Sequence, residues 1–474
     1  MNATVVSRVL ALGCVALVAC RVGPDYRRPT LAVPAAYAGT GAGSGHLDPT
    51  WWQLFHDAAL GALEQRALAG NPGLSAALAR VAQARAVRAQ AAGGQYPTVT
   101  AGATLTRSRD PLTGGDPSTS LVMPFDLSYE LDAWGRVRRS VEASQAQALA
   151  SADNYGVARL TLTANVATTY FTLHSLDSQA AVLASSVDSF RKQLALTRVK
   201  RDAALVGPPD VLQAQTQLDA TLAQQAEIQR QRIDAEHALA ILIGEPPATL
   251  ALPPTPLAGD PPIVPAGLPS ELLRRRPDVV AGEQALVAAS ASIGVAKASL
   301  YPTFSLTASA GLASAALTAP LGWASRAWSL GGGVLAPIFD GGKLRAQVDQ
   351  SRGSYDEALG NYRTAMLQAL ADVENGLTDI GHLQESAAAY QRAADGAREN
   401  LRLVQLQYDQ GLIDYLSVLD AQRTWLGDEL LAAQTLGQRY VSTVLLVKAL
   451  GGGWTVDDGA RVLDAARASG PASR

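Results

Sequence analysis

The chain repeats its own sequence pattern at a spacing of about 205 residues, and this repeat limits its possible folds more than any other feature. The matching pairs, in chain order, are Tyr96-Pro97 with Tyr301-Pro302, Asn154-Tyr155 with Asn361-Tyr362, and Leu242-Ile243-Gly244 with Ala449-Leu450-Gly451. Because several pairs occur in one order at one spacing, we predict two structural repeats, at 56–247 and 268–453. The Pro-rich linker between them, 248–267, is expected to be extended.

Each repeat is predicted to contain a helix, a β-hairpin, a long helix, a break and a further helix. The long helices are indicated by apolar residues that recur at steps of three and four, from Leu162 to Leu194 and from Tyr355 to Ile380. This spacing is typical of a coiled-coil seam. A helix over residues 136–201 would be about 100 Å long, because each residue adds a rise of about 1.5 Å. A long dimeric coiled coil is the alternative, but it leaves the hairpins without a role.

Each hairpin consists of two segments in which apolar and polar residues alternate, as in β-strands with two different faces. In the segment 121–132, Leu121 and Phe125 lie on one face, whereas Asp126 and Glu130 lie on the other. The remaining alternating segments are 98–106, 303–312 and 328–339. Each is about 10 residues long, which is the length of a membrane-crossing strand. The alternative is a soluble sheet with one buried face.

Four strands from one chain are too few to close a barrel, because small barrels need about eight. An unclosed sheet in lipid would leave backbone N–H and C=O groups without partners. Several chains are therefore expected to share one barrel. A dimer would supply eight strands around a filled interior, whereas a trimer would supply twelve and leave a channel. In such a channel, Asp126 and Glu130 predict an acidic lumen with a mild cation preference.

Residues 1–19 have the pattern of a bacterial lipoprotein signal peptide. The apolar run from Val9 to Ala19 is too short to cross a bilayer. It leads into Cys20 through Leu17-Val18-Ala19, which resembles a lipobox, so Cys20 is the predicted site of lipid attachment. Arg21 follows and predicts export to the outer membrane. The alternative is an ordinary secretory signal that contains a chance Cys.

The composition argues against several classes of function. The chain has 39 Lys and Arg against 42 Asp and Glu, so a nucleic-acid partner is not expected. No Cys follows position 20, and no His pair has metal-ligand spacing, so no metal and no cofactor are predicted. We find no phosphate-binding Gly loop and no nucleophile constellation, and therefore predict that the chain is not an enzyme. Surface or structural roles are expected for the five scattered histidines, His46, His56, His174, His237 and His382.

Four motifs follow one another in a fixed order along the chain. They are Val22-Gly23-Pro24-Asp25-Tyr26, Leu272-Leu273-Arg274-Arg275-Arg276-Pro277-Asp278-Val279, Ile293-Gly294-Val295-Ala296-Lys297-Ala298, and Pro337-Ile338-Phe339-Asp340-Gly341-Gly342. Together they resemble the TolC/OprM-like outer-membrane channels of tripartite export systems, especially the NodT-type lipoprotein branch. This resemblance implies a mainly α fold with a transmembrane β part. That fold is an internally duplicated, trimeric α/β barrel, in which twelve strands continue into a long periplasmic tunnel of helices.

The resemblance covers about residues 20–453 and also implies partners. It predicts a homotrimer that is lipid-anchored and barrel-inserted in the outer membrane, with a lipidated extended segment over 20–55 and a flexible tail over 454–474. A periplasmic adaptor (membrane fusion protein) and an inner-membrane transporter, most often a proton-driven RND pump, would complete the system. The chain would then be the passive exit duct for efflux. The alternatives are the duct of a type I protein-secretion system, a periplasmic scaffold without a channel, and a lipoprotein enzyme.

The resemblance further implies a gate at the periplasmic end of the tunnel. Helix breaks at 202–210 and 409–414 mark this end. The family closes it with a Tyr, Asp and Arg network, to which Tyr408, Asp420 and Arg423 correspond here. Asp and Arg three residues apart share a helix face, so they can pair locally or bridge to Tyr408 or to a neighbouring helix. The alternative is an exposed ion pair without a gating role. The equivalent positions of the first repeat differ, and hold Arg201, Gln213 and Thr216.

Overall fold

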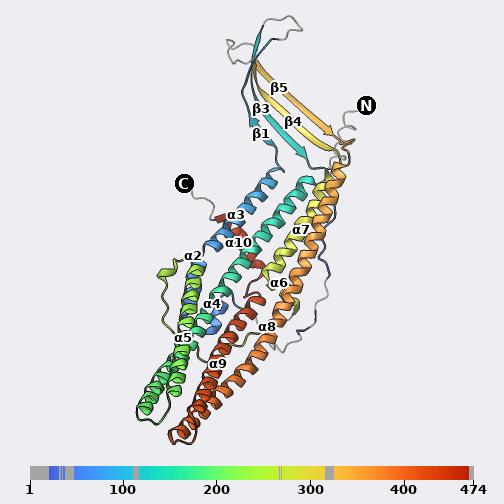
Figure 1. Ribbon diagram of the computed structural model, residues 1–474. Coiled ribbons are helices and arrows are strands. Elements are labelled where there is room, and N and C mark those ends of the chain that lie inside the picture. Colours follow the sequence, from blue (N-terminus) through green and yellow to red (C-terminus); the bar gives the residue numbers. More distant parts are fainter. Residues whose placement is uncertain are drawn as a thin grey trace.

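The protein is described by a computed structural model that covers residues 21–30, 34, 36–37, 47–109, 117–265, 267, 269–314 and 325–468. The molecule is elongated, with a curved β-sheet at one end and long helices that lead away from it to two hairpin tips at the other (Figure 1). Cys20 and His46 lie outside the described residues.

Both halves of the chain share one order of main elements, and the second half ends in an additional helix, α10. The first half holds η1 (Trp51–Phe55), α2 (Ala58–Gly70), α3 (Pro72–Gly93), β1 (Thr98–Ala101), β2 (Thr104–Ser108), β3 (Ser118–Leu131), α4 (Arg136–Asp202) and α5 (Pro208–Ile243). The second half holds η2 (Pro247–Thr249), α6 (Pro269–Arg275), α7 (Pro277–Ala298), β4 (Thr303–Ser314), β5 (Arg326–Leu335), α8 (Lys343–Asp409), α9 (Tyr415–Ala449) and α10 (Val456–Ala468). The predicted long helix over 136–201 is therefore confirmed as α4.

Local sequence signals set where the main helices begin. The side chain of Asn71 accepts a hydrogen bond from the Leu74 N–H at the start of α3, and Pro72 occupies the first turn. Asp132 accepts bonds from the first N–H groups of α4, including that of Val137 at 3.0 Å. Asp414 caps α9 by accepting from the Ser417 N–H. These caps satisfy backbone donors that have no partner within the helix.

The predicted apolar seam of α4 is buried in two successive hydrophobic clusters. The upper cluster includes Val166 and Phe171 and also takes residues from α2, α7, α8 and α9. The lower cluster joins Leu183 and Phe190 of α4 to α5, α8 and α9 near the hairpin tips. Burial of this continuous stripe fixes the two helical hairpins, α4–α5 and α8–α9, side by side.

Helix α7 is long and apolar enough to cross a membrane by length and composition alone, with a mean hydropathy of 1.5 over its best window. However, 56% of that window is buried inside the protein, where α7 packs against α4 and α8. This burial is what a core helix shows, so α7 is weak support for a membrane span.

The sheet has the strand order β1-β3-β4-β5, all antiparallel, with β2 also paired to β3. The predicted strand over 98–106 is interrupted at Gly102-Ala103, where both parts still pair with β3. The predicted strand over 328–339 was too long at its end, because β5 stops at Leu335. Pro337 follows two residues later and has no N–H to donate to a ladder.

The prediction of a flexible tail after residue 453 was wrong for the described part of that segment. Helix α10 packs against α3 and α4 through Leu463, which shares a small cluster with Val81, Ala148 and Ala152. Trp454, just before the helix, is 7% exposed. Apolar burial therefore holds the chain end against the helical body.

The segment 21–30 is tied to the junction between the sheet and the helices. The Val22 N–H donates to the carbonyl of Trp134 at 3.1 Å, directly after β3. Arg139, whose side chain is 1% exposed, pairs with Asp25 at 2.8 Å. Gly23 adopts φ +105°, and a Cβ there would lie 2.5 Å from the Cα of Gly294. The glycine therefore allows both the backbone conformation and the close approach to α7.

Glu64 of α2 is fully buried, and both of its carboxylate oxygens are without a hydrogen-bond partner among the described residues. Burial raises the pKa of Glu64 to about 9, so the side chain is protonated at neutral pH. Because the pKa of Glu64 is higher in the folded state than in the unfolded state, Glu64 contributes least to the stability of the fold at high pH. Its contribution is fully present below about pH 4.5 and is lost progressively as the pH rises towards 9.

We therefore expect Glu64→Met to stabilise the protein, by on the order of 3 kcal/mol at pH 7. Thermal unfolding in detergent should show that the gain grows from pH 5 to pH 8. Glu357, which is exposed on α8, supplies the control, since Glu357→Met should give a shift that does not change with pH. A Glu64→Met gain that is equal at all pH values would contradict the burial argument.

Candidate channel wall and gate

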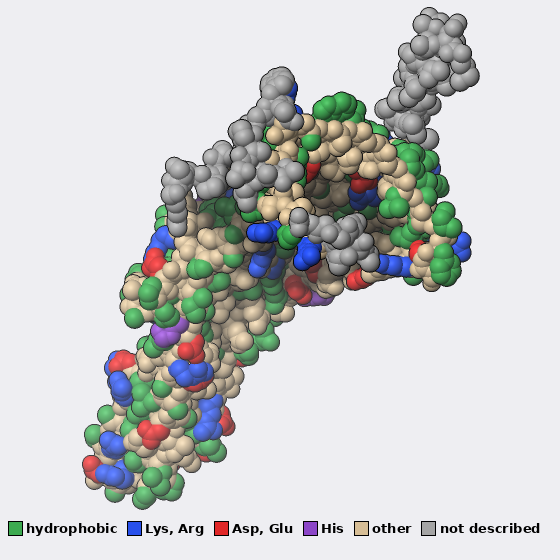
Figure 2. Space-filling model, turned by 90° about the horizontal axis from the view of Figure 1, so that it is seen from above, with side chains coloured by type: hydrophobic (Ala, Val, Ile, Leu, Met, Phe, Trp, Pro, Cys, Tyr) green, Lys and Arg blue, Asp and Glu red, His purple; other side chains and the backbone are tan. Residues whose placement is uncertain are grey.

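One face of the sheet is polar over its middle part. Asp126 of β3 lies opposite Thr100 of β1 and Ser309 of β4, and Ser309 lies opposite Ser329 of β5. Directly opposed residues in neighbouring strands project from the same face. The register thus joins the predicted polar faces of separate strands into one surface. Figure 2 looks onto this end of the molecule and shows acidic and basic side chains inside the hollow of the curved sheet.

The two predicted acidic residues of this face differ in their surroundings. Asp126 is exposed and forms no ion pair within the described residues. Glu130 instead accepts two hydrogen bonds from Arg136, at 2.9 and 2.5 Å. The charge of Glu130 is therefore balanced by a residue at the start of α4, and Asp126 carries the acidic character of the strand.

The opposite face of the sheet is apolar and exposed in the single chain. Phe125 of β3 lies opposite Ala310 of β4, which lies opposite Trp328 of β5. Phe125 is 62% exposed and Trp328 is 80% exposed. A contiguous apolar surface of this kind marks a membrane or protein interface.

Aromatic side chains gather where this face meets the helices. The indole N–H of Trp134 donates to the carbonyl of Pro302 at 2.7 Å, and its ring stacks on Tyr301 with centroids 4.9 Å apart. Aromatic residues that are apolar at one end and hydrogen-bonded at the other favour a membrane–water interface.

Both outer strands of the sheet have an unpaired edge in the single chain. The described strand path ends at β1 and β2 on one side and at β5 on the other. Each unpaired edge presents backbone N–H and C=O groups to the surroundings. A sheet in lipid needs partners for these groups.

At the other end of the molecule, Tyr408 lies between the two hairpin tips. Its ring is 5.7 Å from that of Tyr415, and the Lys200 ammonium lies 4.0 Å above it. Lys200 also pairs with Asp409 at 3.6 Å. The Tyr408 hydroxyl is buried and has no hydrogen-bond partner among the described residues. Burial raises the pKa of Tyr408, and the carboxylates of Asp210 and Asp409 raise it further.

Asp420 and Arg423 are both on α9 but do not pair with each other in the described chain. Arg423 donates from Nε to Oε1 of Gln217 on α5, at 2.9 Å, and so links the two helical hairpins. Asp420 is exposed, and its backbone carbonyl accepts a hydrogen bond from the Thr424 hydroxyl. The structure thus brings Tyr408 and Arg423 into contacts between the hairpins and leaves Asp420 on the surface.

Sequence reasoning missed Lys200, Asp210 and Gln217 in this region. Lys200 lies in the last turn of α4, where the helix dipole favours a cation. A contact of Lys200 at the tip could therefore have been predicted from the sequence. Asp210 follows two prolines in the first turn of α5, which is an equally visible position. Gln217 has no such signal, because its contact depends on how the two hairpins pack.

Comparisons with known proteins agree with this geometry. The family described as "Outer membrane efflux protein" matches residues 63–245 and 268–452, which together are most of the chain. This chain belongs to the outer membrane efflux protein family. The family match contains both helical hairpins and all the strands described above.

Individual relatives of this efflux protein match over nearly their whole length. The chain is 33% identical over 455 residues to "Outer membrane protein OprJ" of Pseudomonas aeruginosa, covering 92% of this chain and 93% of the relative. It is also 33% identical over 454 residues to "Toluene efflux pump outer membrane protein TtgI" of Pseudomonas putida, covering 92% and 96%. The solved structure of the outer-membrane channel OprN matches with a TM-score of 0.86 at 32% identity, covering 92% and 100%. The fold is therefore that of the TolC-like outer-membrane channels.

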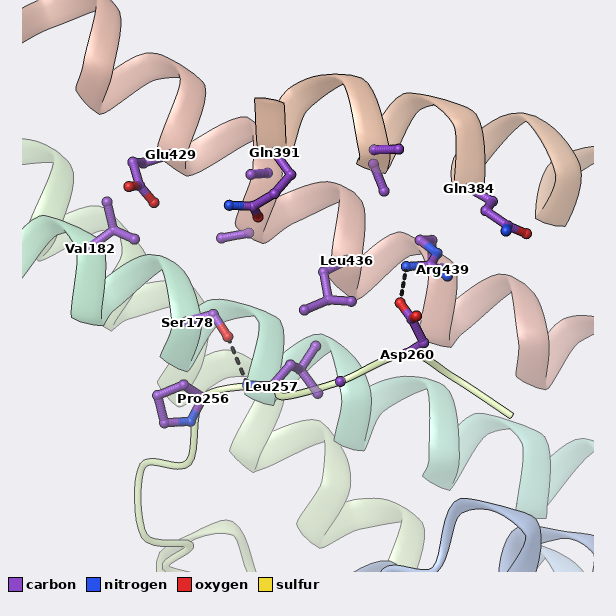
Figure 3. A pocket seen from close by; sticks show the side chains of 15 residues that line it. Ser178, Val182, Pro256, Leu257, Asp260, Gln384, Gln391, Glu429, Leu436 and Arg439 are labelled. Carbon is purple, nitrogen blue, oxygen red and sulfur yellow. Dashed lines mark hydrogen bonds and ion pairs between the residues drawn. The ribbon is translucent and has the colours of Figure 1, made fainter. Parts of the chain in front are cut away.

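A groove of about 570 Å³ lies halfway along the helices of this efflux protein, between α4, α8, α9 and the linker (Figure 3). Across it, Arg439 of α9 pairs with Asp260 of the linker at 2.6 Å, and the Leu257 N–H donates to Ser178 of α4 at 2.9 Å. The remaining lining is largely Ala, Leu and Gln. These contacts hold the linker against the helices and so fix its path.

The histidines of the efflux protein occupy separate positions. His174 is buried on α4, where Nδ1 lies 2.7 Å from the carbonyl of Thr255 and 3.2 Å from Asp177. Asp177 also accepts from Arg232 at 2.6 Å, so His174 is part of a network that binds the linker. In the described parts of the chain, no three His, Cys, Asp or Glu residues group in a way that would hold a metal ion.

Proposed function

We propose that this efflux protein is the exit duct of a tripartite efflux system and that three copies share one outer-membrane barrel. The observation that carries the proposal is the sheet. It has one polar face, one exposed apolar face and two unpaired edges. Three such sheets joined edge to edge would satisfy every edge and place Asp126 towards a water-filled lumen.

The length of the helices supports the remainder of this proposal. Helices α4 and α8 each have 67 residues and would extend about 100 Å from the membrane at about 1.5 Å per residue. Their tips would meet a periplasmic adaptor, which would connect the duct to an inner-membrane transporter of the RND type. OprJ and TtgI are outer-membrane proteins by name, and TtgI is named for a toluene efflux pump.

We also propose that Cys20 carries lipid. Cys20 is outside the described residues, but Val22 is hydrogen-bonded to Trp134 at the junction of sheet and helices. Two residues of chain span at most about 7 Å. Acyl chains on Cys20 would therefore start close to the aromatic ring of Trp134, at the depth of the inner leaflet.

The test is to purify the full chain in detergent, determine its mass, and record currents across planar bilayers. We expect a stable trimer and discrete single-channel currents. A folded monomer that gives no current would contradict the proposed duct. Mass spectrometry of the mature amino terminus would test the lipid separately, because a Cys20→Ser variant should lose the acyl mass.

Asp126 provides a prediction about ion selectivity. We expect Asp126→Asn to lower the preference for cations, because three carboxylates would leave the lumen. Glu130→Gln should move the selectivity further towards anions, since it releases the charge of Arg136. Reversal potentials in a KCl gradient measure both effects. Asp464→Asn on α10 is the control, and an equal change there would argue against a local effect.

A further inference from the structure

The apolar face of the sheet ends in basic residues on the side away from the helices. Leu131, Tyr129 and Leu127 of β3 begin this face near the helices, and Phe125 and Met123 continue it. Arginine enters this face in the row of Met123 and again four residues further along β3. Arg326 of β5 lies opposite Leu312, which lies opposite Met123, and Arg107 of β2 lies opposite Thr119 of β3.

The register assigns these arginines to the outward face rather than to the lumen. Leu105, two residues before Arg107, lies opposite Leu121, and Leu121 belongs to the apolar face. Since side chains alternate along a strand, Arg107 projects to that same side. Arg326 shares its row with the apolar residues Leu312 and Met123. Arg107 and Arg326 are both exposed in the single chain.

The position along the strand matches the far boundary of a bilayer. From Leu131 to Met123 the strand rises by about 27 Å, at about 3.4 Å per residue. A tilt of about 40° reduces this to about 20 Å across the membrane, close to the apolar band of about 25 Å in such proteins. Long arginine side chains can extend the remaining distance to the headgroups.

Charge complementarity identifies the occupant. The described residues 104–109, 117–123 and 325–330 contain Arg107, Arg109 and Arg326 but neither Asp nor Glu. Asp110 and Asp116 lie outside the described residues. Guanidinium groups bind phosphate through paired hydrogen bonds, and the outer leaflet of an outer membrane presents the phosphates of lipid A.

We propose that Arg107, Arg109 and Arg326 bind the phosphate groups of lipid A in the outer leaflet. This rests on the proposed placement of the sheet in the outer membrane. The site fixes the depth of the barrel from outside, at the end of the sheet opposite Trp134.

The experiment compares the full chain with the triple variant Arg107→Gln, Arg109→Gln and Arg326→Gln, reconstituted in phospholipid vesicles that contain lipid A. Native mass spectrometry after extraction counts the lipid A that each protein retains. We expect retention by the triple variant to fall roughly tenfold or more, because several basic contacts to an anionic surface are removed per chain. Dephosphorylated lipid A should bind the original chain as weakly as lipid A binds the triple variant.

A matched control removes three exposed arginines from the helices, at Arg80, Arg191 and Arg392, and should retain lipid A fully. Equal retention by the two triple variants, or equal binding of lipid A with and without phosphate, would overturn the proposal. Single-channel currents in phospholipid alone distinguish this failure from failure of the duct. The triple variant should conduct normally, whereas absence of current from the original chain would count against the duct itself.

Discussion

Leu127→Arg is expected to prevent stable insertion of the sheet, whereas Ser128→Arg, one residue further along β3, is expected to be tolerated. Leu127 lies opposite Ala308 on the apolar face, and Ser128 lies opposite Thr307 on the polar face. Arginine at the midplane of a lipid-facing strand costs about 2–4 kcal/mol per chain. In the proposed trimer this cost would apply three times.

The measurement is the yield of folded oligomer in the outer-membrane fraction, followed by denaturant unfolding in detergent. The two variants add the same side chain at adjacent positions, so each controls for the other. Arginine at position 128 should also move ion selectivity towards anions, which shows that the side chain has entered the lumen. Similar yields for both variants would contradict the assignment of one face to lipid and the other to water.

The combined change Lys200→Ala and Arg423→Ala is expected to open the channel at its periplasmic end. Lys200 joins α4 to Tyr408 and Asp409 of α8, and Arg423 joins α9 to Gln217. Both links connect one helical hairpin to the other. Loss of about 1.4 kcal/mol of such linkage changes the ratio of open to closed states about tenfold. Open probability in planar bilayers measures this ratio.

Arg198 offers a matched control for the gate. It donates to Gln215 at 2.8 Å, in a bond of the same chemistry as that between Arg423 and Gln217. However, the Arg198 bond joins α4 to α5 within one hairpin. We expect Arg198→Ala to leave the open probability unchanged. An equal increase in both variants would show that helix stability, rather than linkage between hairpins, controls opening.

Asp420→Ala separates contacts within a chain from contacts between chains. The Asp420 side chain has no recorded partner in the described chain, although it lies one turn from Arg423. If a neighbouring copy supplies its partner, the single substitution should raise the open probability of the proposed trimer. No change would remove Asp420 from the gate while leaving the roles of Lys200 and Arg423 intact.

Periodicity was sufficient to predict the long elements of this fold. The strand and helix patterns around Phe125 and Val166 each repeat many times, and burial or register then follows the pattern. Shorter elements depend on fewer residues. The break at Gly102-Ala103 and the end of β5 at Leu335 were therefore missed, although Gly and Pro mark both places.

The start of the C-terminal helix has a local signal in the sequence. Thr455 is followed three residues later by Asp458, whose carboxylate accepts from the Thr455 N–H at 2.9 Å. This arrangement is typical of a helix start. Leu463 then supplies the apolar contact that holds α10 in place.

The side-chain pairings of the wall and gate could not be predicted from the sequence. Glu130 has Arg136 as a partner because the chain turns sharply between β3 and α4. Arg423 reaches Gln217 because two hairpins distant in sequence pack together. Such pairings depend on tertiary geometry, so local spacing favoured the pair of Asp420 with Arg423 instead.

The unpaired strand edges make a newly exported chain prone to aggregation before it assembles. In a chain that has not yet assembled, Trp328 and Leu330 of β5 are 80% and 69% exposed. They lie beside unpaired backbone N–H and C=O groups that can pair with a strand of another protein. Such a species aggregates in water in competition with correct assembly. Biogenesis should therefore depend on a holdase chaperone. Depletion of this chaperone should reduce the amount of mature protein more strongly at high expression than at low expression.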